Sequence, residues 1–390
     1  MEEERKLTFS KRRLAAFGAA MAIAGTTAVA SVPSSSAAGA PIKIGVALTY
    51  NNTAFWAAYI NYESQYAKKM HIQLLGPKLA GTNASLQNTQ VEDLVNQGAK
   101  AVIVNPETAT SMVPAINYAA KHHVQLISVD TIVGKGHVYM VVRASNLIYG
   151  EDACAYFASQ HYPAGSYVVD LEGDLTSSNG ADRTNGFNAC MKANAPSINV
   201  LADPTVWVAA TATTDTQTAL NAYGSKLVGI YDQYSGPDPA AVQAVAAKGL
   251  TGKVAIIGDD GVAYEMCYIN SGLMAGAQDQ PADLYAKGAL TYALDSAKGV
   301  KLKAGQAAVG APRLANVSYL GDTNLGDPIV GPLVTKTRMN FQVKDIPGAP
   351  GTFTSRAVTD PTLWGNVYGK AHGGDCAGVQ APSGVTLTAP

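Results

Sequence analysis

The chain has 390 residues, of which 47% are hydrophobic and 15% are charged. This length and composition are enough to bury two ordinary hydrophobic cores, so we expect two lobes rather than one oversized domain. The formal net charge of −1 argues against general binding to nucleic acid or to anionic membranes, because both need clustered basic surface.

Residues 1–30 have the pattern of an export signal. Basic residues precede an uncharged stretch over residues 14–30, which ends in the small-x-small tripeptide typical of a signal peptidase site. A membrane anchor is the alternative, but the stretch is short and rich in Ala, Gly and Thr. A pair of arginines leaves both the general and the twin-arginine export routes open. Residues 31–40, rich in Ser and Ala, are predicted to be a flexible lead-in.

The first regular unit is a strand followed by a helix. An apolar run over residues 42–48 is typical of a buried parallel strand, and an amphipathic segment over about 54–70 follows it. The connecting loop carries Asn52, and Phe55 and Trp56 stand where the helix begins. Ligands of parallel sheets bind at this carboxyl edge of the strands. The two aromatic residues could instead be ordinary core of the helix face.

Apolar runs and helix-like stretches then alternate as far as residue 298. The predicted strands cover residues 72–75, 101–104, 125–129, 138–142, 167–171, 227–231 and 253–257. The predicted helices cover residues 84–98, 108–122, 147–160, 181–194, 212–223, 238–248, 261–271 and 281–298. This alternation predicts an α/β fold of parallel sheets built from right-handed βαβ units, with too many strands for a single small sheet.

Polar residues follow several of these strands at the point where each strand ends. They are Asn105, Asp130, Glu172, Asp232, Gln233, Tyr234, Asp259 and Asp260. Any one of them could simply cap a helix or shape a turn. Because the carboxyl ends of parallel strands meet at one edge, the set as a whole predicts a single polar crevice.

The order of the motifs NNTAFW, VNP, SVD, ADRTNGF, YDQY and GDDG resembles the type I periplasmic solute-binding proteins of ABC importers, in the ribose- and galactose-binding branch. The resemblance covers roughly residues 42–300. It implies two Rossmann-like lobes with parallel sheets and a hinge, which close on a ligand in the cleft. We expect residues 41–145 plus 279–312 to form the N-terminal lobe, residues 146–278 plus 313–345 the C-terminal lobe, and residues 346–390 a C-terminal tail.

The resemblance also implies a ligand set in the first lobe. Phe55 and Trp56 match the aromatic pair that stacks on a sugar ring, and Asn52 lies in the same loop. Asn105 and Asp130 match an amide and a carboxylate that hold sugar hydroxyls. Ala54 stands where the family commonly has Pro, and Thr131 stands where Arg commonly follows the aspartate.

In the second lobe the match continues with a basic, an aromatic and an acidic residue. Arg183 matches the family's arginine, Trp207 falls near an aromatic that covers the other sugar face, and Asp260 matches a late aspartate. Tyr234 stands where the family usually has Asn, and Gln280 covers the last contact. These departures leave the identity of the sugar open.

A polyol needs such a set whatever the family, because its apolar ring faces suit aromatic side chains and its rim of hydroxyls needs polar partners. Each residue still has a structural alternative. Arg183 could be an exposed helix residue paired with Asp182 or a neighbouring carboxylate, and Trp207 could be a buried strand aromatic. If Arg183 contacts only the ligand, Arg183→Ala should weaken ligand binding and leave the stability of the protein nearly unchanged.

Four cysteines, an even number in an exported protein, favour disulfides over the alternative of free buried thiols. Cys154 and Cys190 lie on consecutive predicted helices of one lobe. We therefore prefer Cys154 with Cys190 and Cys267 with Cys376 among the three possible pairings. Because no spacing resembles a zinc site, we expect no metal and no cofactor.

The expected function is that of an exported binding protein in the periplasm or at the extracellular face of the cell envelope. It would capture a small polar ligand, above all a sugar, and deliver it as a monomer to the permease of an ABC importer. A secreted ligand sensor for a membrane receptor is the alternative. A carbohydrate-active enzyme is disfavoured: carboxylates for glycoside hydrolysis are available, but the chain has no nucleotide-binding or nucleophile-elbow motif.

Overall fold

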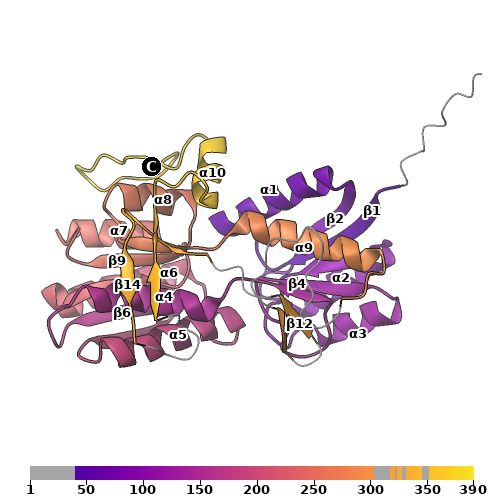
Figure 1. The fold of residues 1–390 in the computed structure, drawn as a ribbon, viewed down its shortest axis with the longest axis horizontal. Coiled ribbons are helices and arrows are strands. Elements are labelled where there is room, and N and C mark those ends of the chain that lie inside the picture. Colours follow the sequence, from indigo (N-terminus) through magenta and orange to yellow (C-terminus); the bar gives the residue numbers. More distant parts are fainter. Residues whose placement is uncertain (1–39, 303–316, 321–322, 327–330, 345–350) are drawn as a thin grey trace, which may run out of the picture. The chain divides into compact units, whose positions relative to one another are not determined.

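A computed structural model of the chain describes residues 40–302, 317–320, 323–326, 331–344 and 351–390. The predicted export signal over residues 1–30 lies outside the described residues, as does the lead-in up to residue 39. The described part contains two seven-stranded sheets and one two-stranded sheet (Figure 1). Among these residues no helix has the length and apolar character that crossing a membrane requires, and no group of side chains could hold a metal ion.

The first sheet has the strand order β11-β12-β5-β4-β3-β1-β2, and the pairs among β1 to β5 are parallel. Its main elements are β1 (Ile42–Leu48), α1 (Ala54–Lys69), β2 (Ile72–Leu79), α2 (Ala84–Asn96), β3 (Ala101–Val104), α3 (Val113–Lys121), β4 (Gln125–Val129), β5 (Met140–Val142) and α9 (Ala282–Ala297). The central strands β3 and β4 are apolar because helices cover both faces of the sheet.

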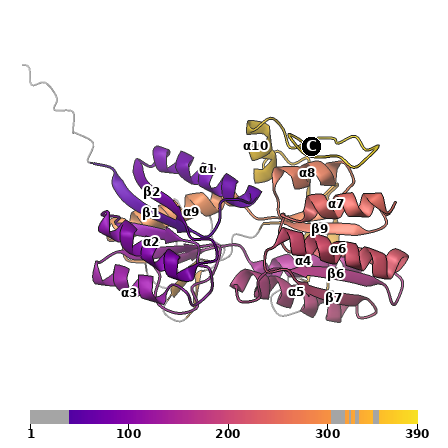
Figure 2. The same cartoon turned by 180° about the vertical axis from the view of Figure 1, so that it is seen from behind.

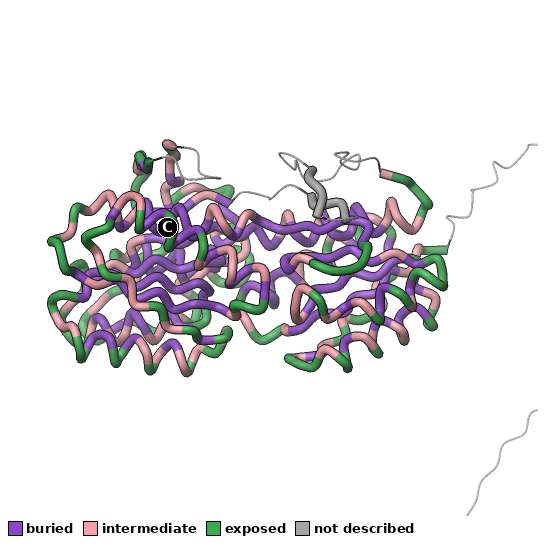
Figure 3. Tube along the Cα trace, turned by 90° about the horizontal axis from the view of Figure 1, so that it is seen from below, coloured by how far each residue is buried: buried purple, intermediate pink, exposed green. Residues whose placement is uncertain are grey.

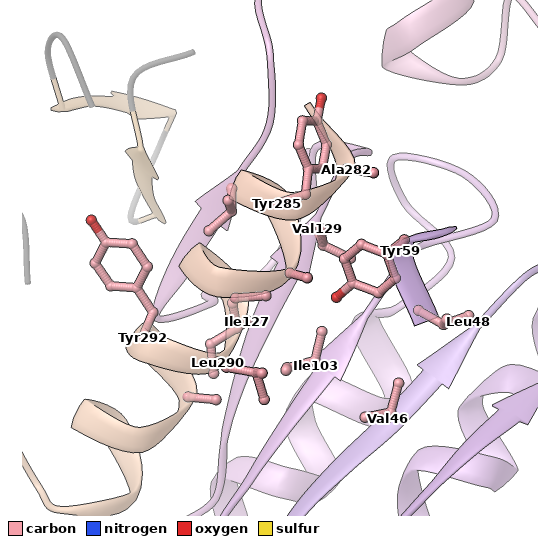
Figure 4. Close-up of a cluster of buried hydrophobic side chains, with 14 of the residues drawn as sticks. Val46, Leu48, Tyr59, Ile103, Ile127, Val129, Ala282, Tyr285, Leu290 and Tyr292 are labelled. Carbon is pink, nitrogen blue, oxygen red and sulfur yellow. The ribbon is translucent and has the colours of Figure 1, made fainter. Parts of the chain in front are cut away.

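Two hydrophobic clusters hold this lobe together. One joins α1 and α9 to one face of the sheet, and the other joins α2 and α3 to the opposite face. Figure 4 shows Leu290 of α9 beside Ile127 and Ile103 of the sheet. The helix predicted over residues 281–298 therefore returns to the first lobe, which fixes the loop ahead of α9 next to the strand ends.

The second sheet has the strand order β16-β13-β10-β9-β8-β6-β7. Its elements are α4 (Asn146–Ser159), β6 (Tyr167–Glu172), α5 (Ser178–Asn194), β7 (Asn199–Pro204), α6 (Ala209–Tyr223), η1 (Gly224–Lys226), β8 (Leu227–Asp232), α7 (Asp238–Ala247), β9 (Ala255–Asp260), α8 (Ala263–Asn270), β10 (Gly276–Asp279), β13 (Leu333–Thr335) and β16 (Arg356–Ala357). Helices α4 and α5 pack on one face, and α6, α7 and α8 pack on the other (Figure 2). Figure 3 shows that the strands of both sheets are mostly buried.

Strand β7 was not among the predicted strands. It is the edge strand of the second sheet, and its residues are exposed or half-buried along its whole length. An edge strand of this kind has no continuous apolar run, which is the signal that revealed its neighbours.

The end of the chain departs from the predicted division. Strands β11 (Val317–Leu320) and β12 (Thr323–Gly326) belong to the first sheet, where β12 pairs with β5. The assignment of residues 313–345 to the C-terminal lobe is therefore wrong for these two strands, although β13 does join the second sheet. The predicted tail holds β15 (Thr352–Thr354), which pairs with β14 (Asn340–Gln342), and β16, which extends the second sheet, before α10 (Trp364–Ala371).

Two disulfides are present. Cys154–Cys190 joins α4 to α5, and Cys267–Cys376 joins α8 to the segment that follows α10. The preferred pairing is thus confirmed, and the alternative of free thiols is wrong. The second bridge closes a sequence separation of 109 residues and ties the C-terminal segment to the second lobe.

Candidate ligand-binding cleft

A cavity of about 750 Å³ lies at the carboxyl ends of the strands and is lined from both lobes. Cavities of roughly 300–1,000 Å³ hold small-molecule ligands in proteins. All ten residues predicted to contact a ligand line it: Asn52, Phe55, Trp56, Asn105, Asp130, Arg183, Trp207, Tyr234, Asp260 and Gln280. The structure therefore brings the predicted set together in one place.

Two aromatic side chains form part of the first-lobe wall. Thr53 caps α1 by accepting a hydrogen bond of 3.1 Å from the backbone N–H of Trp56, which sets the start of the helix at the cavity. Phe55 is 2% exposed and Trp56 8%, and their ring centroids are 5.1 Å apart in an edge-to-face arrangement. Phe55 also packs 5.8 Å from Tyr285 of α9. The core alternative is therefore partly correct, since both side chains belong to the core and line the cavity.

Asp130 is the polar centre of the first-lobe wall. One of its oxygens, Oδ2, accepts a 2.7 Å hydrogen bond from Asn179 of the second lobe. The other, Oδ1, accepts a 3.1 Å bond from the amide of Gln280. Asn105 donates to Thr131 Oγ1 at 3.2 Å and accepts from the hydroxyl of Thr49. Burial raises the pKa of Asp130 to about 6, although the positive charges of Arg183 and Arg143 oppose the rise.

Arg183 is a buried hub rather than an exposed helix residue. Its Nε donates to Asn146 Oδ1 at 2.6 Å, and its other nitrogens donate to Gln233 O and to Gln280 Oε1. The guanidinium also forms an ion pair of 3.4 Å with Asp259 and is only 2% exposed. The suggested partner Asp182 instead pairs with Arg143 at 2.9 Å. The interpretation of Arg183 as an exposed helix residue paired with Asp182 is therefore wrong. Its alternative of a pair with a neighbouring carboxylate is correct, because Arg183 pairs with Asp259.

Two glycines allow the helix pair that positions Arg183. A Cβ at Gly150 of α4 would lie 2.0 Å from the carbonyl oxygen of Arg183, and one at Gly186 of α5 would lie 2.1 Å from that of Leu147. The helices can pack this closely only because both positions lack a side chain. Burial lowers the pKa of Arg183, but the carboxylates of Asp259 and Asp260 outweigh this effect and raise it, so the residue stays charged. Burial raises the pKa of Asp259 to about 7 against the opposing charge of Arg183.

Trp207 lies on a strained loop between β7 and α6. Val206 and Trp207 have φ values of 48° and 62°, a left-handed conformation that is rare for such residues. The indole is half-buried against Gly173 and stands 5.3 Å from the ring of Tyr234, edge to face. The expectation that Trp207 could be a buried strand aromatic is therefore wrong. Strain of this kind persists where the surroundings hold it, and it occurs often at binding sites.

Asp260 ends β9 with a φ of 114°. Its Oδ2 accepts hydrogen bonds from the backbone N–H and the hydroxyl of Ser235, at 3.0 and 2.6 Å. Burial raises the pKa of Asp260, while Arg183 and the Ser235 bonds oppose the rise. The carboxylate is thereby held at the cavity wall.

Comparison with known proteins agrees with this geometry. A family model described as a periplasmic binding protein domain matches residues 44–301. The chain belongs to this family. Membership implies an extracytoplasmic location, and the relatives are binding proteins rather than enzymes.

The relatives of this periplasmic binding protein include a xylitol-binding protein of Mycolicibacterium smegmatis, 28% identical over 67% of this chain and 74% of the relative. The ribose import binding protein of Haemophilus influenzae is 28% identical over 55% of this chain and 72% of its own length. A Caulobacter myo-inositol binding protein, with myo-inositol bound, shares the fold: the TM-score is 0.65 at 24% identity, over 76% of this chain and 94% of that one.

Several residues of the periplasmic binding protein's cleft were not predicted. Asn179, Ser235 and Tyr264 line the cavity. Asn179 lies two residues into α5, where the motif ADRTNGF drew attention only to Arg183. Ser235 follows Tyr234 directly, and the polar strand-end pattern could have been extended to it.

Trp364, which lies outside the family match, contacts two of the residues that line the cleft. Its Nε1 donates a 3.1 Å hydrogen bond to the carbonyl oxygen of Asp260, and its ring lies 6.2 Å from Phe55. The residue is buried within the first-lobe core cluster. One side chain of the C-terminal segment thus contacts a cavity residue from each lobe, and nothing in the local sequence indicated this role.

Proposed function

We propose that this periplasmic binding protein captures a neutral polyol, a sugar or a sugar alcohol, in the cleft and delivers it to the permease of an ABC importer. We further propose that residues 1–30 are an export signal and that the protein acts as a monomer. The observation that carries the proposal is the composition of the cavity wall. Aromatic rings of Trp56, Trp207 and Tyr234 share one cavity with the carboxylates of Asp130 and Asp260.

The polar groups of the cleft suit hydroxyls because they are already organised in donor and acceptor pairs. Asp130 accepts from Asn179 and from Gln280, and Gln280 accepts in turn from Arg183. A hydroxyl both donates and accepts, so a polyol could insert into such a network without leaving a buried group unpaired. An apolar ligand could not do so.

The surroundings of the candidate catalytic carboxylates argue against a carbohydrate-active enzyme. Asp259 is paired with Arg183, and Asp170 accepts a 2.9 Å hydrogen bond from Gln233. Both are fully buried and absent from the cavity wall. A glycosidase needs two carboxyl groups that reach the scissile bond. Two carboxylates that do line the cavity, Asp130 and Asp260, already accept hydrogen bonds from Asn179, Gln280 and Ser235, so we infer binding without catalysis.

A thermal-shift screen tests the proposed ligand class. The screen includes pentoses, hexoses, sugar alcohols, disaccharides, amino acids and aromatic acids. A ligand present at about 1,000 times its Kd stabilises the protein by roughly 4 kcal/mol, so a cognate polyol should raise Tm by several degrees. Shifts caused by amino acids or aromatic acids alone would contradict the proposal, although they would leave the family assignment intact.

A further inference from the structure

A second cavity, of about 570 Å³, lies beside the cleft in the second lobe. Its wall comes from α7, α8, α10 and residues 374–380, so about half of it lies beyond the family match over residues 44–301. Tyr264 and Pro239 line both cavities, so the two cavities are adjacent. The Cys267–Cys376 bridge fixes the C-terminal segment against α8 at this place.

The cavity holds one buried carboxylate. Asp375 is 7% exposed, and within the described part of the chain no hydrogen bond or ion pair reaches its side chain. A Cβ at Gly369 would lie 2.0 Å from Asp375 Oδ1, so the absence of a side chain there makes room for the carboxylate. Burial raises the pKa of Asp375 to about 6, which leaves it mostly ionised at neutral pH. Its carboxylate oxygens remain accessible from the cavity, so a bound cation can pair with them.

Three tyrosines, Tyr264, Tyr268 and Tyr368, line the remaining wall together with His372 and small residues, and several of the polar atoms there are hydrogen-bonded within the protein. Tyr264 donates to Ser235 O at 2.7 Å, and Tyr268 donates to Gln380 O at 3.3 Å. The amide of Gln243 also donates to Gln380 O, at 3.1 Å. Tyr368 stacks on His372 with 4.0 Å between ring centroids. The hydroxyls of Tyr264 and Tyr268 are thus engaged within the protein, so these two residues offer mainly their rings to a ligand.

We propose that this cavity is a second ligand site, which takes a small organic ammonium ion between the tyrosine rings and against the carboxylate of Asp375. An ammonium group gains both from a carboxylate and from the faces of aromatic rings. A sugar lacks the positive charge that a carboxylate beside aromatic rings would bind. The volume lies within the range of small-molecule sites.

Choline chloride is the probe, titrated by calorimetry into the mature protein at neutral pH. The matched control is the neutral analogue of choline in which carbon replaces the quaternary nitrogen. We expect saturable binding of choline to the wild type. Asp375→Asn, which keeps the shape and removes the charge, should weaken it roughly tenfold or more. Tyr368→Leu should weaken it as well, and thermal unfolding checks that each variant is folded.

Asp130→Asn, in the central cleft, should leave choline affinity unchanged. Failure of the polyol proposal would show in the sugar screen and would not alter this result. The site would be refuted by any of three outcomes: no saturable choline binding at millimolar concentration, unchanged affinity in Asp375→Asn, or equally tight binding of the neutral analogue.

Discussion

Removal of the Arg183 side chain should destabilise the protein strongly, contrary to the expectation from sequence. The guanidinium is buried, forms an ion pair with Asp259 and donates hydrogen bonds to Asn146, Gln233 and Gln280. Breaking a buried pair by removing one partner costs about 3–5 kcal/mol, because the other charge stays buried without compensation. At ~2–4 °C per kcal/mol, the Tm of Arg183→Ala should fall by roughly 6–20 °C.

Differential scanning calorimetry and urea unfolding of the ligand-free protein measure this effect. Arg356→Ala is the matched control, since Arg356 pairs with Asp360 where both side chains are about one-third exposed. Such a pair contributes at most about 1 kcal/mol. The double variant Arg183→Ala with Asp259→Asn should lose less free energy of unfolding than the two single variants together. The reason is that Asp259→Asn removes the unpaired buried charge that Arg183→Ala leaves. A stable Arg183→Ala, or strictly additive costs, would refute the reasoning.

Three further predictions concern the tail, the bridge and pH. Trp364→Ala should lower the free energy of unfolding by about 3–5 kcal/mol and also weaken ligand binding. Trp364→Phe, which loses the Asp260 bond and part of the ring volume, should lose less of both; urea melts and titrations compare the two variants. Cys376→Ser should lower the free energy of unfolding by about 2–5 kcal/mol. Alkylation followed by intact-mass analysis should find a free thiol only in this variant. Burial raises the pKa of Asp130 to about 6 and of Asp279 to about 8. The folded state therefore holds more protons than the unfolded state above pH ~4, so Tm should fall as pH rises from about 4 to about 8; a Tm that rises over that range would contradict these pKa directions.

The sheet cores and the site were largely predictable because they depend on local patterns. The apolar runs at residues 101–104 and 125–129 have the same bounds as β3 and β4. Parallel strands that end at one edge bring their following residues together. That rule gathers Asn105 and Asp130 at the edge of the first sheet and Tyr234 and Asp260 at the edge of the second, and the family resemblance predicted that the two edges share one cleft.

The remainder could not be predicted because it depends on contacts between distant segments. Arg183 is buried by Asn146, Gln233 and Gln280, whose spacing in sequence carries no periodic signal. Trp364 contacts Asp260 and Phe55, which lie far from it in the sequence, and its segment is tied to α8 by a disulfide. Strand β7 lies at a sheet edge, where exposure removes the apolar run.

Calorimetric titration of the best polyol from the screen tests the central claim most directly. Wild type should bind it saturably with one site. Asp130→Asn should bind roughly 10- to 150-fold more weakly, because a hydrogen bond to a charged group contributes about 1.5–3 kcal/mol. Asp375→Asn, outside the cleft, should bind it like the wild type. If no polyol binds, or if Asp130→Asn binds one as tightly as the wild type, the account of the cleft is wrong.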